Sequence, residues 1–600
     1  MLPAGYLYSY RDDDVSFEWS PDSRWLTATV GSIVTNQDIV MLDASGRGGP
    51  ISVAHSGYNE TAPQFSPDGK AVLWTAGRED LRQAEIGPGP QDIYLAYLTR
   101  AGFDGKAEVS GDRWQPQPVG MEQRTKRLTP YALSPLFYAL APGHDSLLIV
   151  ERAPGGKAVG WRLDVASGEM SELFAQPRAD TYALDVARQQ LYALAEGAVQ
   201  RIDLASGTTR TFALDTRIQV DLPAELAYWF NHFWRLTKFK FYEPTMHGVD
   251  WDAVRARYAR FLPHLDTWED FAEMMSEMAG ELNASHTGCS YLKPAPVADH
   301  TASLGLYFDD DYSGPGLRVA AVLPGGPADL TGSHLAPGAT ILAFDTEMVD
   351  ARTNLDQLLN AMAGTAVQLR IQPADGSPRV TETVVPVSAA QAAALSYAHW
   401  VDGRKQLTEK LSGGRLGYVH VPAMDLETYR RVYSEVVGDY RNKDGLIIDV
   451  RYSTGGNLHD EFLTLFTGEL LAGFTNRQDE LVGRIPSSRW ARPTALLQNA
   501  SSYSDGSIFS HLYQRRKLGP VIGEAVPGTG TAVWWMYPMK GALKWGIPQL
   551  GARDLKTGWF ENEETVPDLP VDNDPAAIAA GRDPQLEAAV TALLRKLPRR

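Results

Sequence analysis

The sequence predicts a multidomain α+β fold, because the spacing of hydrophobic residues changes character several times along its 600 residues. Short runs of alternating apolar and polar residues fill the first third, helical spacing follows, and strand-like and helix-like runs alternate in the last third. Since single domains usually contain about 100–200 residues, one hydrophobic core cannot serve the whole chain. We therefore expect four parts: β repeats in 1–215, a helical domain in 216–299, a small domain in 300–388 and a layered α/β core in 389–600.

The composition narrows the classes of partner and cofactor. A formal net charge of -17 argues against nucleic acid or an anionic membrane surface, because binding to either depends on basic patches. The only cysteine, Cys289, allows no intrachain disulfide and no cysteine-based metal cluster. We therefore expect no nucleic-acid partner, no metal and no other cofactor, while the redox compartment stays open.

The first residues, Met1–Leu7, lack the basic region and the apolar run of a secretory signal. No apolar stretch approaches the roughly 18 residues that span a bilayer. As written, the sequence predicts a cytoplasmic protein without a membrane span. If Met1 instead marks a truncated start, the protein would be periplasmic or secreted.

A loose repeat in 1–215 predicts β-hairpins. The turn Ser20-Pro21-Asp22 returns as Ser66-Pro67-Asp68-Gly69, and alternating apolar runs flank both copies. The sequences at the ends of the repeats also recur, as in Asp164–Gly168 and Asp203–Gly207. Their spacing of roughly 40–50 residues is what four-stranded propeller blades require. These repeats resemble blades of the TolB and tricorn type. About four blades are counted, which is few for a closed ring, so the propeller could be incomplete; an irregular β-sandwich is the alternative.

Two further segments differ from the repeats. Residues 222–282 place aromatic side chains at helical spacing, which indicates a small helical domain with an aromatic core, and the end of this domain carries Ser285-His286. Residues 300–388 resemble a PDZ module, with strands at Leu304–Leu306 and Leu317–Val322 and an amphipathic helix at Asn354–Ala363. In such modules a strand edge beside a helix accepts an extended peptide; a spacer with a covered groove is the alternative.

The last third alternates strands and helices and predicts a layered α/β domain whose site lies at the strand ends. The expected strands are Leu416–Val421, Gly445–Arg451, Ala495–Leu497 and Val521–Gly523, and the expected helices are 426–438, 460–471 and 508–517. Within this part, Ser504 stands directly before a helix. A serine at that position is either an N-cap or a nucleophile that exploits the unpaired amides of the helix start.

Five motifs follow one another in a fixed order: Ser285-His286, Asp449–Arg451 with Gly455-Gly456, Ser504-Asp505-Gly506, Leu518–Gly523 and Glu561-Asn562. In this order, and together with the propeller-like repeats and the PDZ-like module, they resemble the tricorn-type peptidases of the S41 family. The similarity covers most of the chain. It implies an α/β S41 core, a serine-type peptidase, a peptide or unfolded-protein substrate, and a homo-oligomer.

The resemblance also implies a role for each site residue: Ser504 as nucleophile, His286 as general base, Ser285 and Glu561 as the hydrogen-bond chain behind it, and the amides of Gly456 and Asp505 as the oxyanion hole. The chemistry needs these types, because a serine hydroxyl is a poor nucleophile until a base near neutral pKa takes its proton. A carboxylate one step removed would fix the imidazole tautomer through the serine.

Several residues keep alternatives. His459 and Asp460 suggest a metal or a second dyad, but without further ligands at metal spacing we interpret them as helix-start residues. The acids considered for a preference for basic side chains are Asp460, Glu461, Glu469 and Asp479. Thr529–Trp535 lines either a cleft or the core. The alternative function is that of a non-hydrolytic protein that binds peptides on the PDZ-like and propeller surfaces. The presence of all four residue types, at Ser504, His286, Ser285 and Glu561, favours the enzyme.

Overall fold

A computed structural model describes most of the chain, namely residues 16–33, 36–78, 90–105, 114–153, 156–179, 181–195, 197–213, 219–292, 300–479, 481–539 and 542–598. The prediction about Met1–Leu7 lies outside these residues. The chain divides into two compact units: one contains 1–291, 456–461 and 530–561, and the other contains 292–455, 462–529 and 562–600. None of the helices in the described ranges is both long and apolar enough to cross a membrane.

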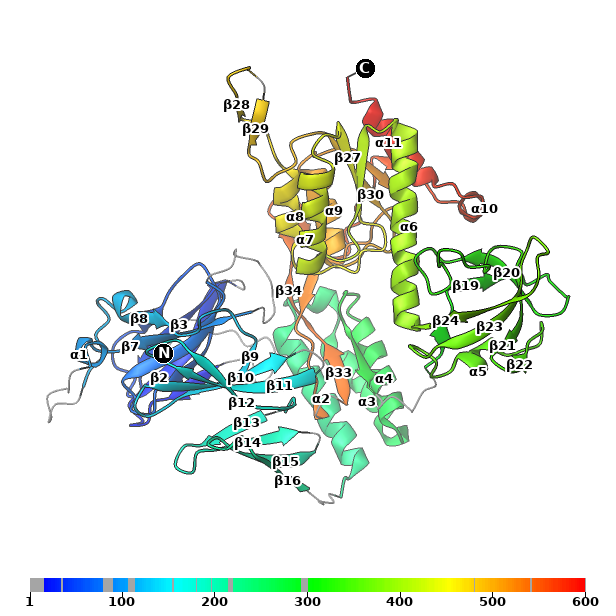
Figure 1. The fold of residues 1–600 in the computed structure, drawn as a ribbon. Coiled ribbons are helices and arrows are strands. Elements are labelled where there is room, and N and C mark those ends of the chain that lie inside the picture. Colours follow the sequence, from blue (N-terminus) through cyan, green and yellow to red (C-terminus); the bar gives the residue numbers. More distant parts are fainter. Residues whose placement is uncertain are drawn as a thin grey trace. The chain divides into compact units, whose positions relative to one another are not determined.

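Four antiparallel sheets of four strands each follow one another in the described part of residues 16–213 (Figure 1). In every sheet the strands lie side by side in chain order, so each sheet is a meander. The strands are β1 (Phe17–Trp19), β2 (Trp25–Ile33), β3 (Asn36–Asp43), β4 (Ile51–Ala54), β5 (Glu60–Phe65), β6 (Ala71–Ala76), β7 (Asp92–Tyr97), β8 (Thr125–Arg127), β9 (Pro135–Leu140), β10 (Ser146–Ala153), β11 (Lys157–Asp164), β12 (Met170–Pro177), β13 (Thr181–Asp185), β14 (Gln190–Ala195), β15 (Ala198–Asp203) and β16 (Thr209–Ala213). A short helix, α1 (Arg100–Phe103), follows β7.

The repeated Ser-Pro-Asp turn has a physical reason. Ser66 Oγ accepts the amide of Ala71 at 2.9 Å and donates to Asp68 Oδ1 at 2.7 Å, which closes the hairpin between β5 and β6. Ser20 makes the equivalent pair of bonds, to the Trp25 amide at 2.9 Å and Asp22 at 2.6 Å. The repeat in the sequence is therefore a repeat of one turn structure.

Consecutive sheets pack face to face because the inner strands place alternate side chains on opposite faces. On β6, Ala71 and Leu73 join the cluster shared with the third sheet, whereas Val72 and Trp74 join the cluster shared with the first. On β10 the same alternation divides its apolar side chains between the second and fourth sheets. Stacked four-stranded sheets of this kind are the arrangement of propeller blades, and they correspond to the four repeats counted from the sequence.

The helical segment forms a second core in the same unit. It consists of α2 (Leu222–Lys240), α3 (Trp251–Ala259) and α4 (Trp268–Gly280), followed by β17 (Gly288–Tyr291). An excursion from the last third of the chain completes this core: β33 pairs with β17, and Trp545 is buried against Phe233 of α2, with ring centroids 5.4 Å apart. The strands of the excursion are β32 (Thr531–Val533), β33 (Leu543–Gly546), β34 (Pro548–Gly551), β35 (Arg553–Asp554) and β36 (Gly558–Trp559).

In the other unit, residues 300–388 form a small module around an antiparallel sheet of order β19-β20-β21-β23-β24, with β22 on β21 and a separate β18–β25 pair. Its elements are β18 (Ala302–Ser303), β19 (Leu306–Phe308), β20 (Leu317–Val322), β21 (Thr340–Phe344), β22 (Glu347–Met348), α5 (Leu355–Leu359), β23 (Val367–Gln372), β24 (Val380–Val384) and β25 (Val387–Ser388). The helix is shorter than expected and ends at Leu359.

The rest of this unit is a layered α/β domain around a five-stranded parallel sheet of order β26-β27-β30-β31-β37. Its elements are α6 (Ala389–Ser412), β26 (Leu416–His420), α7 (Leu426–Ser434), β27 (Gly445–Asp449), α8 (His459–Phe466), the hairpin β28 (Ala472–Thr475) and β29 (Leu481–Ile485), β30 (Thr494–Gln498), α9 (Asp505–Arg515), β31 (Val521–Gly523), β37 (Leu569–Pro570), α10 (Pro575–Ala579) and α11 (Pro584–Leu594). Helices α6 and α11 cover one face of the sheet, and α7, α8 and α9 lie on the other (Figure 1). The predicted multidomain α+β fold is thus confirmed.

Candidate active site

The predicted site residues belong to both units. Ser285, His286 and Glu561 lie in the unit with the β repeats, as does Gly456, whereas Ser504 and Asp505 lie in the α/β unit. Each group has its own supporting contacts. The serine group stands at the carboxyl end of β30, where parallel sheets usually place their sites.

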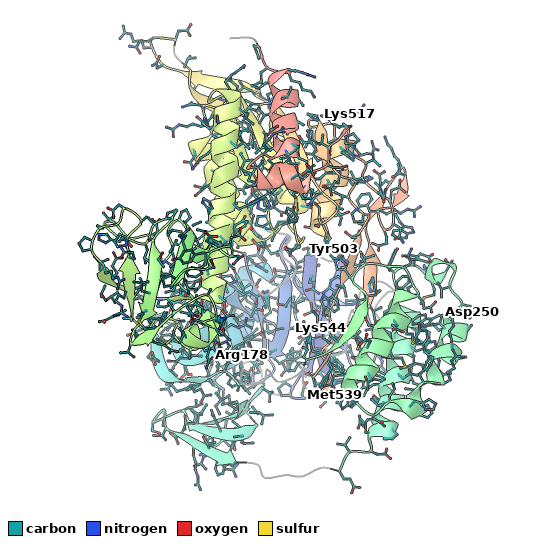
Figure 2. The ribbon with its side chains drawn as sticks, turned by 90° about the vertical axis from the view of Figure 1, so that its right-hand side faces the viewer. Arg178, Asp250, Tyr503, Lys517, Met539 and Lys544 are labelled. Carbon is teal, nitrogen blue, oxygen red and sulfur yellow. The ribbon has the colours of Figure 1, made fainter. Side chains whose placement is uncertain are left out.

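Ser504 is held in a strained backbone conformation at the start of α9. Its φ of 52° and ψ of -124° lie in a region that residues with a side chain seldom adopt. The residue occupies the N-cap position, but its hydroxyl makes no capping hydrogen bond, so the simple cap anticipated as one alternative is wrong in that respect. A sharp strand-to-helix turn is the geometry that presents a nucleophilic serine. Figure 2 labels Tyr503 and Lys517, which flank the two ends of α9.

The turn around Ser504 is fixed by hydrogen bonds from its own unit. The Ser504 amide donates to Thr529 Oγ1 at 2.8 Å, and the Tyr503 amide donates to the Ser453 carbonyl at 2.9 Å. The hydroxyl of Ser502 donates to the Val450 carbonyl at 2.9 Å. These bonds join the serine turn to the end of β27, which is where the double-glycine turn begins.

Gly455 packs directly against Ser504. Its φ is +89°, and a Cβ added there would lie 2.4 Å from Ser504 Cβ, 2.9 Å from the Tyr503 carbonyl oxygen and 3.0 Å from the Asp505 amide nitrogen. No side chain fits into that space, so the close approach of the two turns requires glycine. The next residue, Gly456, is exposed and has a φ of 152°.

A buried ionic network anchors the strand that leads into this turn. Arg451 is 1% exposed and donates Nη1 and Nη2 to the two oxygens of Asp583, each at 3.0 Å. It also donates Nη2 to Asp449 at 2.6 Å, and Tyr418 Oη donates to the same carboxylate at 2.7 Å. Burial opposes ionisation of Asp583, but the Arg451 guanidinium outweighs it, so the pKa of Asp583 is below its usual value. Since Asp583 caps α11, the network ties that helix to the turn.

The second group places Ser285 between His286 and Glu561. Ser285 Oγ lies 2.9 Å from His286 Nδ1 and donates to Glu561 Oε2 at 2.9 Å, while the Ser285 amide donates to Glu561 Oε1. An ionised carboxylate only accepts, so the single hydroxyl proton of Ser285 is directed to Glu561. Ser285 Oγ is then an acceptor toward His286, which favours the tautomer with the proton on Nδ1 and a lone pair on Nε2.

Thr531 belongs to the same cluster and was not predicted as a site residue. Its hydroxyl lies 2.8 Å from Ser285 Oγ and 2.9 Å from His286 Nδ1, and it donates to the Ser285 carbonyl at 3.2 Å. The sequence suggested Thr529–Trp535 as either cleft or core, on the strength of its aromatic residues. In the structure, the hydroxyl groups of Thr529 and Thr531 form hydrogen bonds with Ser504 and Ser285, respectively, while Trp534 and Trp535 are half-buried.

Burial and a further hydrogen-bonded pair surround Glu561. Its exposed fraction is 7%, and burial raises the pKa of the carboxyl group against the opposing effect of the Ser285 hydrogen bonds. Nearby, Tyr242 Oη lies 2.6 Å from His247 Nε2, and His247 Nδ1 donates to the Leu282 carbonyl at 2.8 Å. Tyr242 packs its ring against Trp559, with centroids 5.0 Å apart. The pair therefore joins the segment before Ser285 to the segment before Glu561.

The remaining predicted residues have simpler positions. His459 is the first residue of α8 and Asp460 lies in its first turn, so their interpretation as helix-start residues is confirmed. Within the described ranges, no three histidine, cysteine or acidic side chains are grouped to hold a metal ion. The four acids considered for specificity stay candidates.

Comparisons with known proteins give the family context of this geometry. Residues 222–280 match the family model of the tricorn protease C1 domain, and residues 415–571 match that of peptidase family S41. Tricorn protease homolog 1 of Streptomyces coelicolor is 29% identical over 64% of this chain and 37% of its own length. A second tricorn homolog from that organism is 26% identical over 97% of this chain and 54% of its own length. The tricorn protease homolog of Saccharolobus solfataricus is 24% identical over 97% of this chain and 57% of its own length.

Among solved structures, the crystal structure of the tricorn protease matches with a TM-score of 0.79 at 19% identity, over 97% of this chain and 59% of that chain. This match shows a shared fold. The chain covers between 54% and 70% of the length of the curated relatives that it matches over 97% of its own length. The predicted resemblance to tricorn-type S41 peptidases is confirmed, and the S41 match indicates a serine-type peptidase domain.

Proposed function

We propose that this chain, which carries the C1 and S41 segments of the tricorn-type peptidases, is a serine peptidase that cleaves peptide bonds through Ser504. The observation that carries the proposal is the backbone of Ser504, strained and uncapped at a helix start. Strain of this kind persists only where the surrounding structure imposes it, and it clusters at catalytic positions. A structural cap would have the ordinary extended backbone and a hydrogen bond to the helix.

In the proposed reaction, His286 Nε2 takes the proton of the Ser504 hydroxyl as Oγ bonds to the substrate carbonyl carbon. The C–N bond then breaks, and the imidazolium returns the proton to the leaving amine. Water hydrolyses the acyl-enzyme by the same proton transfers and restores the serine. The hydrogen bond from Ser285 to Glu561 supports this role, because it makes Ser285 Oγ an acceptor for the Nδ1 proton of His286, and the tautomer with that proton has its lone pair on Nε2.

The developing oxyanion would be stabilised by the amides of Gly456 and Asp505. Each donor in such a hole contributes about 3 kcal/mol to transition-state stabilisation in other hydrolases. The amide of Asp505 is also the first of α9, so the partial positive charge of the helix start adds to its effect. We expect the glycine turn to position its own donor because Gly455 fits closely against Ser504.

The proposed substrate is a peptide or an unfolded polypeptide, in keeping with the relatives that are named as proteases. A homo-oligomer and a cytoplasmic location remain predictions, as does capture of substrate chains by the PDZ-like module. No specific observation favours the non-hydrolytic binding protein over the peptidase.

The test uses the Ser504→Ala variant and a set of fluorogenic peptides. We expect hydrolysis to be lost with the fold intact, because one partly exposed hydroxyl contributes little to stability. Ser501→Ala, at an exposed serine of the same turn, is the matched control and should keep full activity. A serine-reactive phosphonate should modify Ser504 alone, as read by mass spectrometry of the digested protein. Unchanged turnover in the Ser504→Ala variant, or modification at another serine, would refute the assignment.

A further inference from the structure

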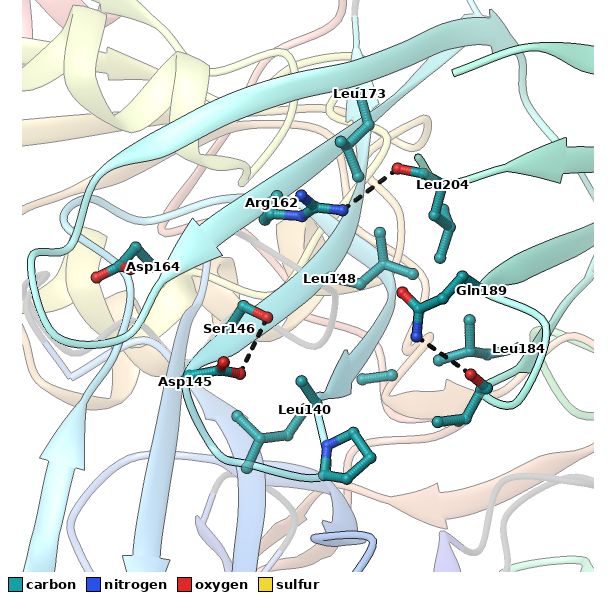
Figure 3. A pocket seen from close by; sticks show the side chains of 14 residues that line it. Leu140, Asp145, Ser146, Leu148, Arg162, Asp164, Leu173, Leu184, Gln189 and Leu204 are labelled. Atoms are coloured by element: carbon teal, nitrogen blue, oxygen red, sulfur yellow. Dashed lines mark hydrogen bonds between the residues drawn. The ribbon is translucent and has the colours of Figure 1, made fainter. Parts of the chain in front are cut away.

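A cavity of about 420 Å³ lies between the third and fourth β sheets, and none of the predicted catalytic residues lines it (Figure 3). It is formed where the turn after β9 faces the turn between β13 and β14, with the strands β10 and β11 as its floor. Its size is in the range of small-molecule binding sites in proteins. The proposed peptidase chemistry gives it no role.

The walls of the cavity combine apolar side chains with polar and charged ones. The larger apolar side chains that line it come from both sheets: Leu140, Pro142, Leu148, Leu173, Leu184, Val186 and Leu204. Leu148 and Leu204 are buried, whereas Val186 at the edge is 38% exposed. A ligand with one or two aliphatic side chains would therefore find a preformed apolar surface that is open at one side.

One guanidinium group reaches the cavity from β11. Arg162 is an exposed strand residue, and its Nη2 donates to the Leu204 carbonyl at 3.3 Å across the gap between the sheets. That bond uses one of the five N–H groups of the side chain. Two acids, Asp145 and Asp164, line the cavity together with Arg162. The remaining N–H groups can therefore bind a carboxylate in the bidentate manner that suits arginine.

The two acids differ in the hydrogen bonds that their carboxylates already accept. Asp164 Oδ1 accepts the amides of Ala166 and Ser167 and the Ser167 hydroxyl, so this carboxylate closes its own turn. Among the residues that the structure describes, the side chain of Asp145 accepts a hydrogen bond from the Ser146 hydroxyl alone, at 3.3 Å. Figure 3 shows Arg162 and Asp145 at separate points of the cavity wall. The site therefore combines one cation, one available carboxylate and an apolar wall.

This combination selects one class of ligand. The carboxylate of a fatty acid would be repelled by the acids of the cavity, and a cationic ligand would be repelled by Arg162. A sugar would place hydroxyl groups against leucine side chains, where they find no hydrogen-bond partner. A short peptide with free ends has a carboxylate, an ammonium group and aliphatic side chains. Two or three residues span roughly 7–11 Å when extended.

We propose that the cavity between the third and fourth β sheets binds short zwitterionic peptides with aliphatic side chains, the terminal carboxylate on Arg162 and the terminal ammonium on Asp145. The inference concerns equilibrium binding and does not depend on hydrolysis by Ser504. Peptides of this kind are also what a peptidase releases, so the site would respond to product.

The test is calorimetric titration of the full chain in the Ser504→Ala background, which prevents turnover. The probes are leucyl-leucine, its N-acetyl form and its C-terminal amide. We expect leucyl-leucine to bind with a dissociation constant of roughly 1 mM or tighter. Each modified form should bind at least tenfold more weakly, because each lacks one of the two charges.

Two variants assign the charges. Arg162→Gln should weaken leucyl-leucine at least tenfold and leave the C-terminal amide unaffected, whereas Asp145→Asn should weaken leucyl-leucine and leave the N-acetyl form unaffected. Arg152→Gln, at an exposed arginine of β10 outside the cavity, is the control and should bind like the parent. Val186→Trp, which fills the open side without touching either charge, should block all three probes. Absence of binding to the parent, or equal affinity of Arg162→Gln and the parent for leucyl-leucine, would overturn the proposal.

Discussion

Replacement of Gly455 by alanine should damage both the stability and the activity of the α/β unit. The added Cβ would lie 2.4 Å from Ser504 Cβ, and it would close on the Tyr503 carbonyl and the Asp505 amide at 2.9 and 3.0 Å. Such overpacking costs about 1–3 kcal/mol, and a residue with a side chain at a φ of +89° costs about 1–2 kcal/mol more. The sum is about 2–5 kcal/mol, and part of it would be relieved by moving Ser504 away from its present position.

The kinetic consequence follows from that movement. A displacement of about 1 Å at a reacting group can cost on the order of a hundredfold in rate, so we expect kcat of Gly455→Ala to fall by about that factor. The substrate's contacts away from Ser504 are unchanged, and KM should stay within about threefold of the parent value. The measurements are peptide hydrolysis over a range of concentrations and unfolding in urea, both on the full chain.

Gly403→Ala is the matched control, because Gly403 lies within α6 and an added methyl group would meet no heavy atom of the described residues within 4 Å. Alanine in a helix is preferred to glycine by about 0.5–1 kcal/mol, so this variant should be at least as stable as the parent. If Gly455→Ala unfolds like the control and keeps kcat within twofold, the close packing of Gly455 on Ser504 has no catalytic meaning and the reasoning fails.

Three further predictions concern side chains behind the site. Thr531→Val should lower kcat roughly tenfold with KM unchanged, because a misoriented imidazole loses part of the 10²–10⁴-fold that general bases contribute; steady-state kinetics measures this, and an equal rise in KM would contradict it. Burial raises the pKa of Glu561, so the folded state binds the carboxyl proton more tightly than the unfolded state does. The free energy of unfolding of the parent, relative to that of Glu561→Gln, should therefore rise as the pH falls, and this gain should be lost as the pH rises through the folded-state pKa. Urea unfolding at a series of pH values measures this difference. The opposite pH dependence holds for Asp583, because Arg451 lowers the pKa of its carboxyl group. Asp583→Asn should lower the free energy of unfolding by about 3–5 kcal/mol at neutral pH, and this difference should vanish in acid, where Asp583 of the parent is protonated. A difference that does not change with pH would contradict the inferred role of the network.

Periodicity in the sequence predicted the elements that bury a regular face. The three helices in 222–282 appear as α2, α3 and α4 because their aromatic and methionine side chains recur at helical spacing and meet in one core. The repeated Ser-Pro-Asp turns mark the hairpins that open two of the four sheets, because Ser20 and Ser66 close them with the same hydrogen bonds. In these segments local chemistry and tertiary packing agree.

Other features follow from contacts between distant parts of the chain, which periodicity does not reveal. We expected residues 389–600 to form one α/β domain, but residues 530–561 belong to the other unit. The reason is that Trp545 and its neighbours complete the hydrophobic core of the helical segment. The length of α6, which runs from Ala389 to Ser412, was likewise not expected. Its apolar contacts come from the sheet and from α11, far away in the sequence.

Residue types at the candidate site were predictable, whereas the bonds that orient them were not. Ser285, His286, Glu561 and Ser504 were identified through motifs, but a motif says nothing of Thr531, whose role depends on where its hydroxyl lies in space. The same distinction applies to the alternative that Ser504 is a simple cap. Ser504 has the residue type that favours an N-cap and occupies that position with a φ of 52°, yet its side chain makes no capping hydrogen bond.

The absence of a capping hydrogen bond at Ser504 bears on the proposed chemistry. A serine that caps its own helix has its oxygen engaged by an amide, and the bond must break before the oxygen can attack a carbonyl carbon. At Ser504 the strained backbone removes that competition, and Thr529 compensates by accepting the amide hydrogen of Ser504 at 2.8 Å. Thr529→Val should therefore lower kcat, since the backbone could relax toward the ordinary cap conformation. A crystal structure of that variant with an unchanged φ at residue 504, together with an unchanged kcat, would show that Thr529 does not maintain the strain.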